Sequence, residues 1–197
     1  MISVVICNEG FVITDKVVVG IAGMPGAGKG VFQKTLQKLG YYVVTMGDAV
    51  REEVQRRNLE PTPENLGKTM LSLRETDGPA AIAKKCIPKL EKLPGPVVVI
   101  DGIRSLVEVE EFKKYFPDFV LLAIHASPKT RYNRLVRRKR SDDPENWETF
   151  VERDQRELGI GMGSVIAVAD YMIINEGTLR HLQQKTLTFV GRVLKDE

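Results

Sequence analysis

The residues best suited to chemistry lie at positions 23–30, where the chain reads Gly-Met-Pro-Gly-Ala-Gly-Lys-Gly. This run matches the phosphate-binding loop G-x-x-x-x-G-K-[ST] at every fixed position but the last. In such a loop, backbone N–H groups converge on the β-phosphate, glycines permit the positive φ angles that this requires, and the lysine bridges β- and γ-phosphate oxygens. The run therefore predicts a nucleoside triphosphate site formed by Gly23, Met24, Pro25, Gly26, Ala27, Gly28, Lys29, Gly30 and Val31.

The last position of the loop bears on metal binding. Gly30 stands where most such loops carry a serine or threonine that contacts Mg²⁺, so metal binding must depend on another residue or on water. Asp101 is the candidate, because it follows an apolar strand predicted at 97–100, and ligands of open α/β sheets collect at the carboxyl ends of strands. We expect Asp101 to hold Mg²⁺ directly or through water. An ordinary Asp-Gly turn is the competing interpretation.

Strand-like and helix-like segments alternate along the chain, which is typical of a parallel sheet with helices on both faces. Strands are predicted at 16–22, 42–45, 97–100, 119–124 and 171–174. Helices are predicted at 31–39, 106–115, 128–139, 144–158 and 178–194, with a helical stretch at 48–93 that prolines and glycines interrupt. Asp143 and Pro144 are expected to cap and begin the helix at 144. Residues 2–15 are an apolar stretch with a turn at 8–10, interpreted as a hairpin added to the edge of the sheet.

Length and composition favour a small cytoplasmic enzyme. The 197 residues suit one well-buried domain, and we interpret residues 1–197 as a single domain. The formal net charge of +3 is too small to favour a nucleic-acid partner. The two cysteines, Cys7 and Cys86, are far apart and lack metal-ligand spacing, which suits a reducing compartment. No apolar run approaches the ~20 residues of a membrane span, so no membrane contact is expected. The oligomeric state is left open.

Arginines are concentrated on the helix predicted at 128–139, where Arg131, Arg134 and Arg138 share one face. The following helix carries Arg153. Phosphoryl transfer spreads negative charge over three equatorial oxygens, and arginines stabilise that charge. A solvated helix face and a nucleic-acid patch are the rival interpretations. The second is disfavoured because acidic residues elsewhere balance the charge and few aromatic residues lie between the basic ones.

Several segments, in this order, resemble the archaeal family of P-loop NTPases related to adenylate kinase and dephospho-coenzyme A kinase. Thr45-Met-Gly-Asp-Ala-Val-Arg51 is similar to the adenylate kinase segment whose arginine grips the acceptor phosphate, and Asp101-Gly-Ile-Arg104 resembles its Asp-Gly-Phe-Pro-Arg with one residue fewer. The spacing of Arg134 and Arg138 matches the Arg-x-x-x-Arg that introduces the lid in both kinases, and Arg140-Ser-Asp-Asp143 resembles the lid-closing Arg-x-Asp-Asp. Residues 169–177 resemble the closing strand and loop of dephospho-coenzyme A kinases.

This resemblance implies a P-loop NTPase fold of class α/β, with a five-stranded parallel sheet, a helical acceptor-binding lobe at 48–92 and a short lid at 138–147. It implies ATP and Mg²⁺ as ligands, with Arg134 and Asn175 beside the adenine. The residues that would bind the acceptor are Asp48, Arg51 and Arg104, with Asp48 as the base if the acceptor is a hydroxyl. The residues that would serve catalysis are Lys29, Asp101, Arg138 and Arg153.

The function implied is that of a nucleoside-monophosphate-type kinase, which transfers the γ-phosphoryl group of ATP to a nucleotide-like acceptor. A dephospho-coenzyme A kinase-like enzyme is an alternative within the same class. A regulatory protein that binds and slowly hydrolyses ATP is the alternative from another class, because neither Gly30 nor Val31 supplies the hydroxyl usual in such loops. The acceptor and the choice between ATP and GTP as donor are left open.

Overall fold

The computed structural model describes residues 4–7, 10–13, 16–140 and 142–194. Its central sheet contains five parallel strands in the order β4-β5-β3-β6-β7. These strands are β3 (Val17–Ala22), β4 (Tyr42–Thr45), β5 (Val97–Asp101), β6 (Val120–His125) and β7 (Tyr171–Ile174). The helices are α1 (Lys29–Lys38), α2 (Met46–Arg56), α3 (Pro63–Asp77), α4 (Ala81–Lys92), α5 (Leu106–Tyr115), α6 (Pro128–Arg138), α7 (Trp147–Ile160), α8 (Met162–Ala167) and α9 (Leu179–Val193). The predicted α/β P-loop architecture is confirmed.

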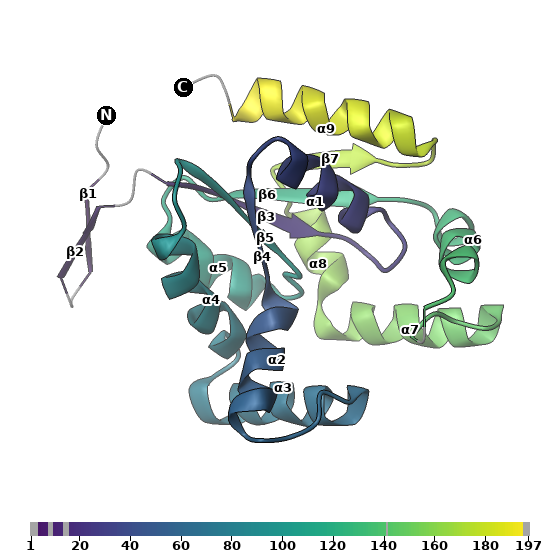
Figure 1. Cartoon of the computed structure of the whole chain (residues 1–197), viewed down its shortest axis with the longest axis horizontal. Helices are drawn as coiled ribbons and strands as arrows, with labels where there is room; N and C mark the ends of the chain where they lie inside the picture. Colours follow the sequence, from purple (N-terminus) through teal and green to yellow (C-terminus); the bar gives the residue numbers. More distant parts are fainter. Residues whose placement is uncertain (1–3, 8–9, 14–15, 141, 195–197) are drawn as a thin grey trace.

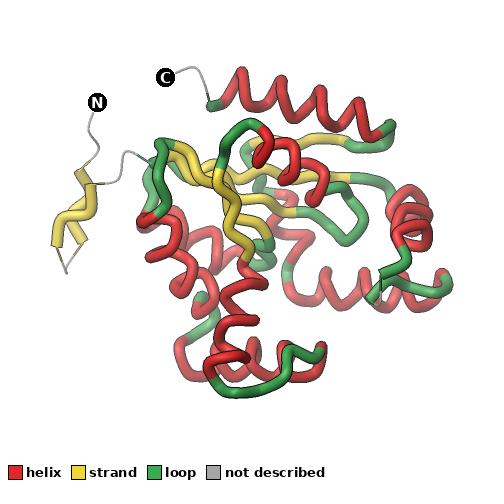
Figure 2. Tube along the Cα trace, viewed as in Figure 1, coloured by secondary structure: helices red, strands yellow, loops and turns green. Residues whose placement is uncertain are grey.

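Helices cover both faces of the sheet (Figure 1, Figure 2). The alternation of side chains along β3 explains the two layers, because its odd-numbered residues face one side and its even-numbered residues the other. Val19 and Ile21 pack with α1 and α9, whereas Val18 and Ala22 pack with α2, α4, α5 and α8. A strand buried on both faces must be apolar throughout, which accounts for the sequence Val-Val-Val-Gly-Ile-Ala of β3.

The helical stretch expected at 48–93 divides into α2, α3 and α4, which connect β4 to β5. Thr62 caps α3 by accepting a hydrogen bond from the backbone N–H of Asn65, and α3 ends before Gly78, whose φ is 86°. α2 begins at Met46, two residues before the expected start, so Asp48 lies in its first turn. α3 packs against both α2 and α4, so the three helices form one lobe below the sheet in Figure 1.

Two expectations about local structure were wrong. Asp143 and Pro144 do not begin the helix near 144; α7 begins at Trp147, and Asn146 caps it in a reciprocal capping box with Thr149. Asp143 instead accepts hydrogen bonds from Arg138 and from the backbone N–H of Arg140. The expected hairpin is present as β1 (Val4–Cys7) and β2 (Gly10–Ile13), but it forms a separate antiparallel sheet instead of extending an edge of the main one. Residues 8 and 9 of its predicted turn lie outside the described residues.

Candidate nucleotide-binding site

The loop at 23–30 joins the carboxyl end of β3 to α1, as expected for a phosphate-binding loop. Three of its glycines have positive φ: 152° at Gly23, 81° at Gly26 and 114° at Gly28. A Cβ at Gly28 would also lie 2.4 Å from the side-chain nitrogen of Asn175. Other residues rarely adopt this backbone conformation, so the loop requires glycine at these positions. The loop presents its N–H groups at the first turn of a helix, where an anion is stabilised.

Lys29 folds back over the loop. Its Nζ donates hydrogen bonds to the carbonyl oxygens of Gly23, at 2.5 Å, and Met24, at 3.4 Å. Burial lowers the pKa of Lys29, while the nearby carboxylate of Asp101 acts in the opposite direction. The ammonium group therefore lies where an anion would be strongly attracted, and phosphate oxygens could replace the two carbonyl groups as its partners.

A cleft of about 700 Å³ opens beside this loop. Its walls contain most of the predicted site residues, which come from α1, β5, α6, α7 and the loop after β7: Lys29, Asp101, Arg104, Arg134, Arg138, Arg153 and Asn175. Asp48 and Arg51 are not among the described residues that line the cleft. They form an ion pair with each other on α2, and their side chains are about half exposed. Their predicted role at the acceptor stays a prediction.

Three arginines in the walls of the cleft are each paired with a carboxylate. Arg104 Nε lies 3.1 Å from Glu157 Oε2, and Arg153 Nη2 lies 3.0 Å from Asp142 Oδ2. Arg138 Nε lies 3.0 Å from Asp143 Oδ2, and this contact raises the pKa of Arg138 and lowers that of the aspartate. The arginines are thus held at the cleft by acids that phosphate groups could displace.

The loop that carries Arg104 is fixed by a buried glutamate. Glu108 Oε2 accepts hydrogen bonds from the backbone N–H groups of Arg104, at 2.9 Å, and Ser105, at 3.3 Å. Its Oε1 accepts a hydrogen bond from Arg74, which lies on α3. The position of Arg104 is therefore tied to the α2–α4 lobe, through a carboxylate that is only 1% exposed.

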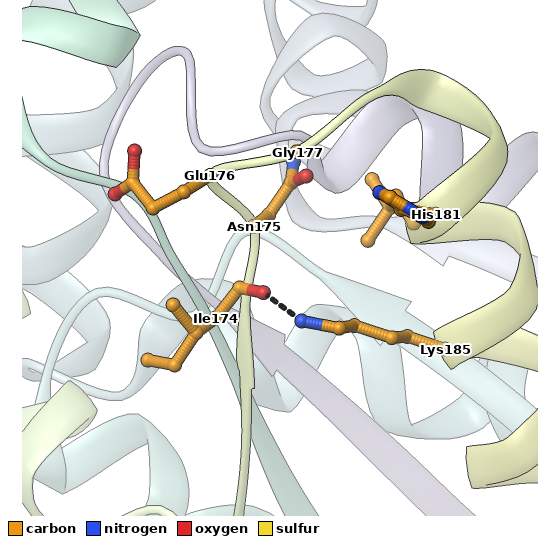
Figure 3. A pocket seen from close by; sticks show the side chains of 7 residues that line it. Ile174, Asn175, Glu176, Gly177, His181 and Lys185 are labelled. Carbon is orange, nitrogen blue, oxygen red and sulfur yellow. Dashed lines mark hydrogen bonds between the residues drawn. The ribbon is translucent and has the colours of Figure 1, made fainter.

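The loop after β7 contacts both the phosphate-binding loop and α6. Asn175 donates a hydrogen bond from Nδ2 to the carbonyl oxygen of Ala27, at 2.8 Å, and Arg134 Nη2 donates to the carbonyl oxygen of Gly177, at 3.2 Å. A second pocket of about 320 Å³ adjoins the cleft here, with His181 and Lys185 of α9 on its other side (Figure 3). The predicted pair Arg134 and Asn175 therefore lies together at one end of the cleft.

Arg131 was grouped with Arg134 and Arg138 in the sequence, but it points into the protein. Its guanidinium forms a bidentate ion pair with Asp154 of α7 and donates hydrogen bonds to the carbonyl oxygens of Ala126, at 3.0 Å, and Pro25, at 3.2 Å. The ring of Phe150 lies 5.1 Å from it. Arg131 thus links α6, α7 and the phosphate-binding loop. Figure 1 shows α6 and α7 as neighbours at the right of the view.

Asp101 has the properties expected of a residue near a cation. Its Oδ1 is buried and has no hydrogen-bond partner among the described residues. Burial raises the pKa of Asp101, and the ammonium group of Lys29 opposes this effect. Within the described residues, no group of three or more His, Cys, Asp or Glu side chains could hold a metal ion. The buried carboxylate of Asp101, which lines the same cleft as the phosphate-binding loop, fits Mg²⁺, because this ion is usually bound through one or two carboxylates together with phosphates and water.

The cleft also contains residues that the sequence interpretation missed, and Gln33 and Glu157 are two of the polar ones. Gln33 lies four residues after Lys29 on α1, and Glu157 lies four residues after Arg153 on α7. Residues four apart share a helix face, so this spacing could have identified both.

Comparison with known proteins decides the family. A family model described as AAA domain matches residues 22–151. A UPF0200 protein of Pyrococcus furiosus is 52% identical over 160 residues, which cover 79% of this chain and 86% of the relative. A UPF0200 protein of Staphylothermus marinus is 50% identical over 178 residues, covering 90% of this chain and 93% of the relative. The chain belongs to the UPF0200 family.

Solved structures share the fold at low sequence identity. TT1252 from Thermus thermophilus has a TM-score of 0.64 at 17% identity, covering 90% of this chain and 98% of its own. Shikimate kinase from Acinetobacter baumannii has a TM-score of 0.52 at 17% identity, covering 89% of this chain and 92% of its own. A gluconokinase from Sinorhizobium meliloti has a TM-score of 0.54 at 14% identity, covering 93% and 96%. This UPF0200 chain therefore has a P-loop kinase-like fold. None of the helices in its described parts has the length and apolar character needed to cross a membrane.

Proposed function

We propose that this protein is a phosphotransferase of the nucleoside monophosphate kinase type, which moves the γ-phosphoryl group of ATP to a nucleotide-like acceptor. One observation carries the proposal: the phosphate-binding loop and arginines from three separate segments, Arg104, Arg138 and Arg153, line a single cleft. A protein that only held a triphosphate would have little use for cations from so many segments. Phosphoryl transfer depends on them, because positioning and charge stabilisation supply most of its rate.

The donor would lie along the loop. Backbone N–H groups and Lys29 would hold its phosphates, and the adenine would lie toward Arg134 and Asn175, which meet at the end of the cleft beside the second pocket. Asp101 would hold Mg²⁺, which when bound neutralises charge on the phosphates. Asn175 would keep the loop in its binding conformation through its hydrogen bond to Ala27.

The acceptor would lie between the α2–α4 lobe and Arg104. Thr45 is in register with Asp101, so α2 begins at the carboxyl edge of the sheet, where the acceptor must approach the donor. Arg104 would exchange Glu157 for the acceptor, and Arg51 would exchange Asp48. If the acceptor is a phosphate, no general base is needed. If it is a hydroxyl, Asp48 would be freed by the same exchange to accept its proton.

The segment at 138–147 would act as a lid. Arg153 is held by Asp142, whose side chain is 58% exposed, and Arg138 is held by Asp143, whose side chain is 3% exposed. When a triphosphate enters, the guanidinium groups would turn from these aspartates to the transferring group. An exposed ion pair is worth only about 0–1 kcal/mol, so the exchange would cost little at Arg153. At Arg138 it would cost more, because it leaves the buried carboxylate of Asp143 without this partner.

The experiment is a screen of ADP formation from Mg-ATP with AMP, CMP, UMP, GMP and dephospho-coenzyme A added singly. Shikimate would be included as a hydroxyl acceptor, because a kinase of shared fold binds it. Lys29→Ala protein is the blank. Stimulation by one acceptor, absent in the blank, supports the proposal and identifies the acceptor. ATP binding with a slow turnover that no acceptor changes would favour a regulatory ATP-hydrolysing protein.

The acceptor site is tested by a matched pair of variants. Arg104→Ala should raise the KM for the acceptor and leave the affinity for ATP nearly unchanged. Arg137→Ala, which removes an exposed arginine of α6 that is not among the lining residues, should change neither quantity. An unchanged acceptor KM in Arg104→Ala would remove Arg104 from the acceptor site.

A further inference from the structure

The glycine at position 30 is not demanded by the backbone or by space. A Cβ built on Gly30 meets no atom within 4 Å, and Gly30 is not among the glycines with positive φ. A serine or threonine could therefore stand there without strain. Its absence leaves the metal-facing side of the loop without the usual hydroxyl, and Val31 supplies none. Some other oxygen must complete the site if Mg²⁺ accompanies the nucleotide.

Gln33 lies one helical turn beyond Lys29 and lines the same cleft as Asp101. Burial raises the pKa of Asp101, and Lys29 and the polar side chain of Gln33 act in the opposite direction, which indicates that the amide lies close to this carboxylate. Since an ionised carboxylate only accepts hydrogen bonds, Gln33 would turn its amide nitrogen toward Asp101, and its carbonyl oxygen would remain available as a ligand. Asp101 Oδ1, buried and without a partner among the described residues, is the second oxygen of this pair.

We propose that Gln33 and Asp101 together hold Mg²⁺ or its bound water and take the place of the hydroxyl that the loop lacks. This inference rests on the proposed ATP-binding function. Mg²⁺ prefers oxygen ligands and keeps several waters, which suits one carboxylate and one amide oxygen beside the phosphates. Gln33 would also orient Asp101 through its amide nitrogen, and losing such a partner typically costs about 10- to 100-fold in metal affinity.

The test measures how strongly Mg²⁺ strengthens nucleotide binding, without any acceptor or turnover. The dissociation constant of a fluorescent ATP analogue is determined with Mg²⁺ and with EDTA, and the ratio of the two values is compared between proteins. Gln33→Met removes both amide groups and keeps the length of the side chain. We expect it to reduce the ratio about tenfold, with little change of affinity in EDTA. Gln155→Met, at an exposed position of α7 that is not among the described residues lining the cleft, is the control and should keep the wild-type ratio.

A rescue variant separates loss of the metal site from damage to the fold. Gly30→Ser added to Gln33→Met should restore most of the Mg²⁺ effect, because the serine would return the usual hydroxyl to an open position. A Gln33→Met protein with the wild-type ratio would overturn the inference and leave the proposed kinase function intact. Absence of nucleotide binding by the wild-type protein would overturn both.

Discussion

The ion pair between Arg131 and Asp154 provides the sharpest test of how the site is held together. Asp154→Ala would remove the carboxylate and leave the guanidinium of Arg131, which is only 4% exposed, without its charged partner. Breaking a buried pair in this way costs roughly 3–5 kcal/mol. Asp154 is 13% exposed, so water can partly replace it, and we expect the lower end of this range, about 3 kcal/mol of unfolding free energy.

The control is Asp142→Ala, which removes the carboxylate paired with Arg153. Asp142 is 58% exposed, so its loss should change the unfolding free energy by less than about 1 kcal/mol. Urea denaturation followed by circular dichroism measures both variants. The two substitutions remove the same group from an arginine pair, and the difference between them isolates burial. An equal cost for the two would refute the assignment of Arg131 as a buried structural residue.

The same variant has a second readout. Arg131 Nη1 donates a hydrogen bond to the carbonyl oxygen of Pro25 in the phosphate-binding loop, while Asp154 is not among the residues lining the cleft. Asp154→Ala should therefore weaken ATP binding, measured by calorimetry under conditions where the variant is folded, through the loop that Arg131 holds. ATP affinity equal to that of the wild type would show that the loop is held by its own geometry and by other contacts.

Three further predictions concern other parts of the chain. Gly28→Ala should abolish measurable ATP binding, because it combines a φ of 114° with a Cβ 2.4 Å from the side-chain nitrogen of Asn175; normal affinity would contradict the loop geometry. The pKa of Glu53 is lowered to about 2, chiefly by hydrogen bonds from two arginines. The ionised carboxylate should therefore contribute about 1–2 kcal/mol to the unfolding free energy above pH 4.5, and this contribution is lost as the pH falls toward 2. In Glu53→Gln, the urea midpoint should depend less on pH over that interval than in the wild type. Burial raises the pKa of the Cys86 thiol to about 12, so little thiolate is present at pH 8. In a Cys7→Ser background, a disulfide reagent at pH 8 should therefore react with Cys86 only after unfolding. Rapid reaction of the native protein would argue against that burial.

The parts of the fold that the sequence predicted are those with local signals. β4, β7 and α5 were expected at their observed bounds, because apolar runs between turn residues mark strands and the alternation of strands with helices places a helix after β5. The phosphate-binding loop was found because its glycines have a fixed spacing. Asn146 was missed as the cap of α7 because Asp143 and Pro144 carry a local capping signal of similar strength. In the structure, Asp143 does not cap a helix and instead accepts a hydrogen bond from Arg138.

The contacts that complete the site could not be predicted, because they join residues far apart in the chain. Arg104 and Glu157 are separated by 53 positions, and nothing in either segment indicates the other. Arg131 showed only its helical spacing, which groups it with Arg134; the turn of its side chain toward Asp154 depends on how α7 packs on α6. Sequence spacing thus indicated which face of a helix carries charge, and only the packed structure distinguishes the arginines of the cleft from the arginine beneath it.

The central claim is that the cleft transfers a phosphoryl group to an acceptor. Its most direct test is to follow the γ-phosphoryl group of isotopically labelled ATP by mass spectrometry in the presence of the acceptor that most stimulates ADP formation. We predict that the label appears in the phosphorylated acceptor, and that Lys29→Ala protein transfers none. Label found only in inorganic phosphate, whatever acceptor is present, would contradict the claim.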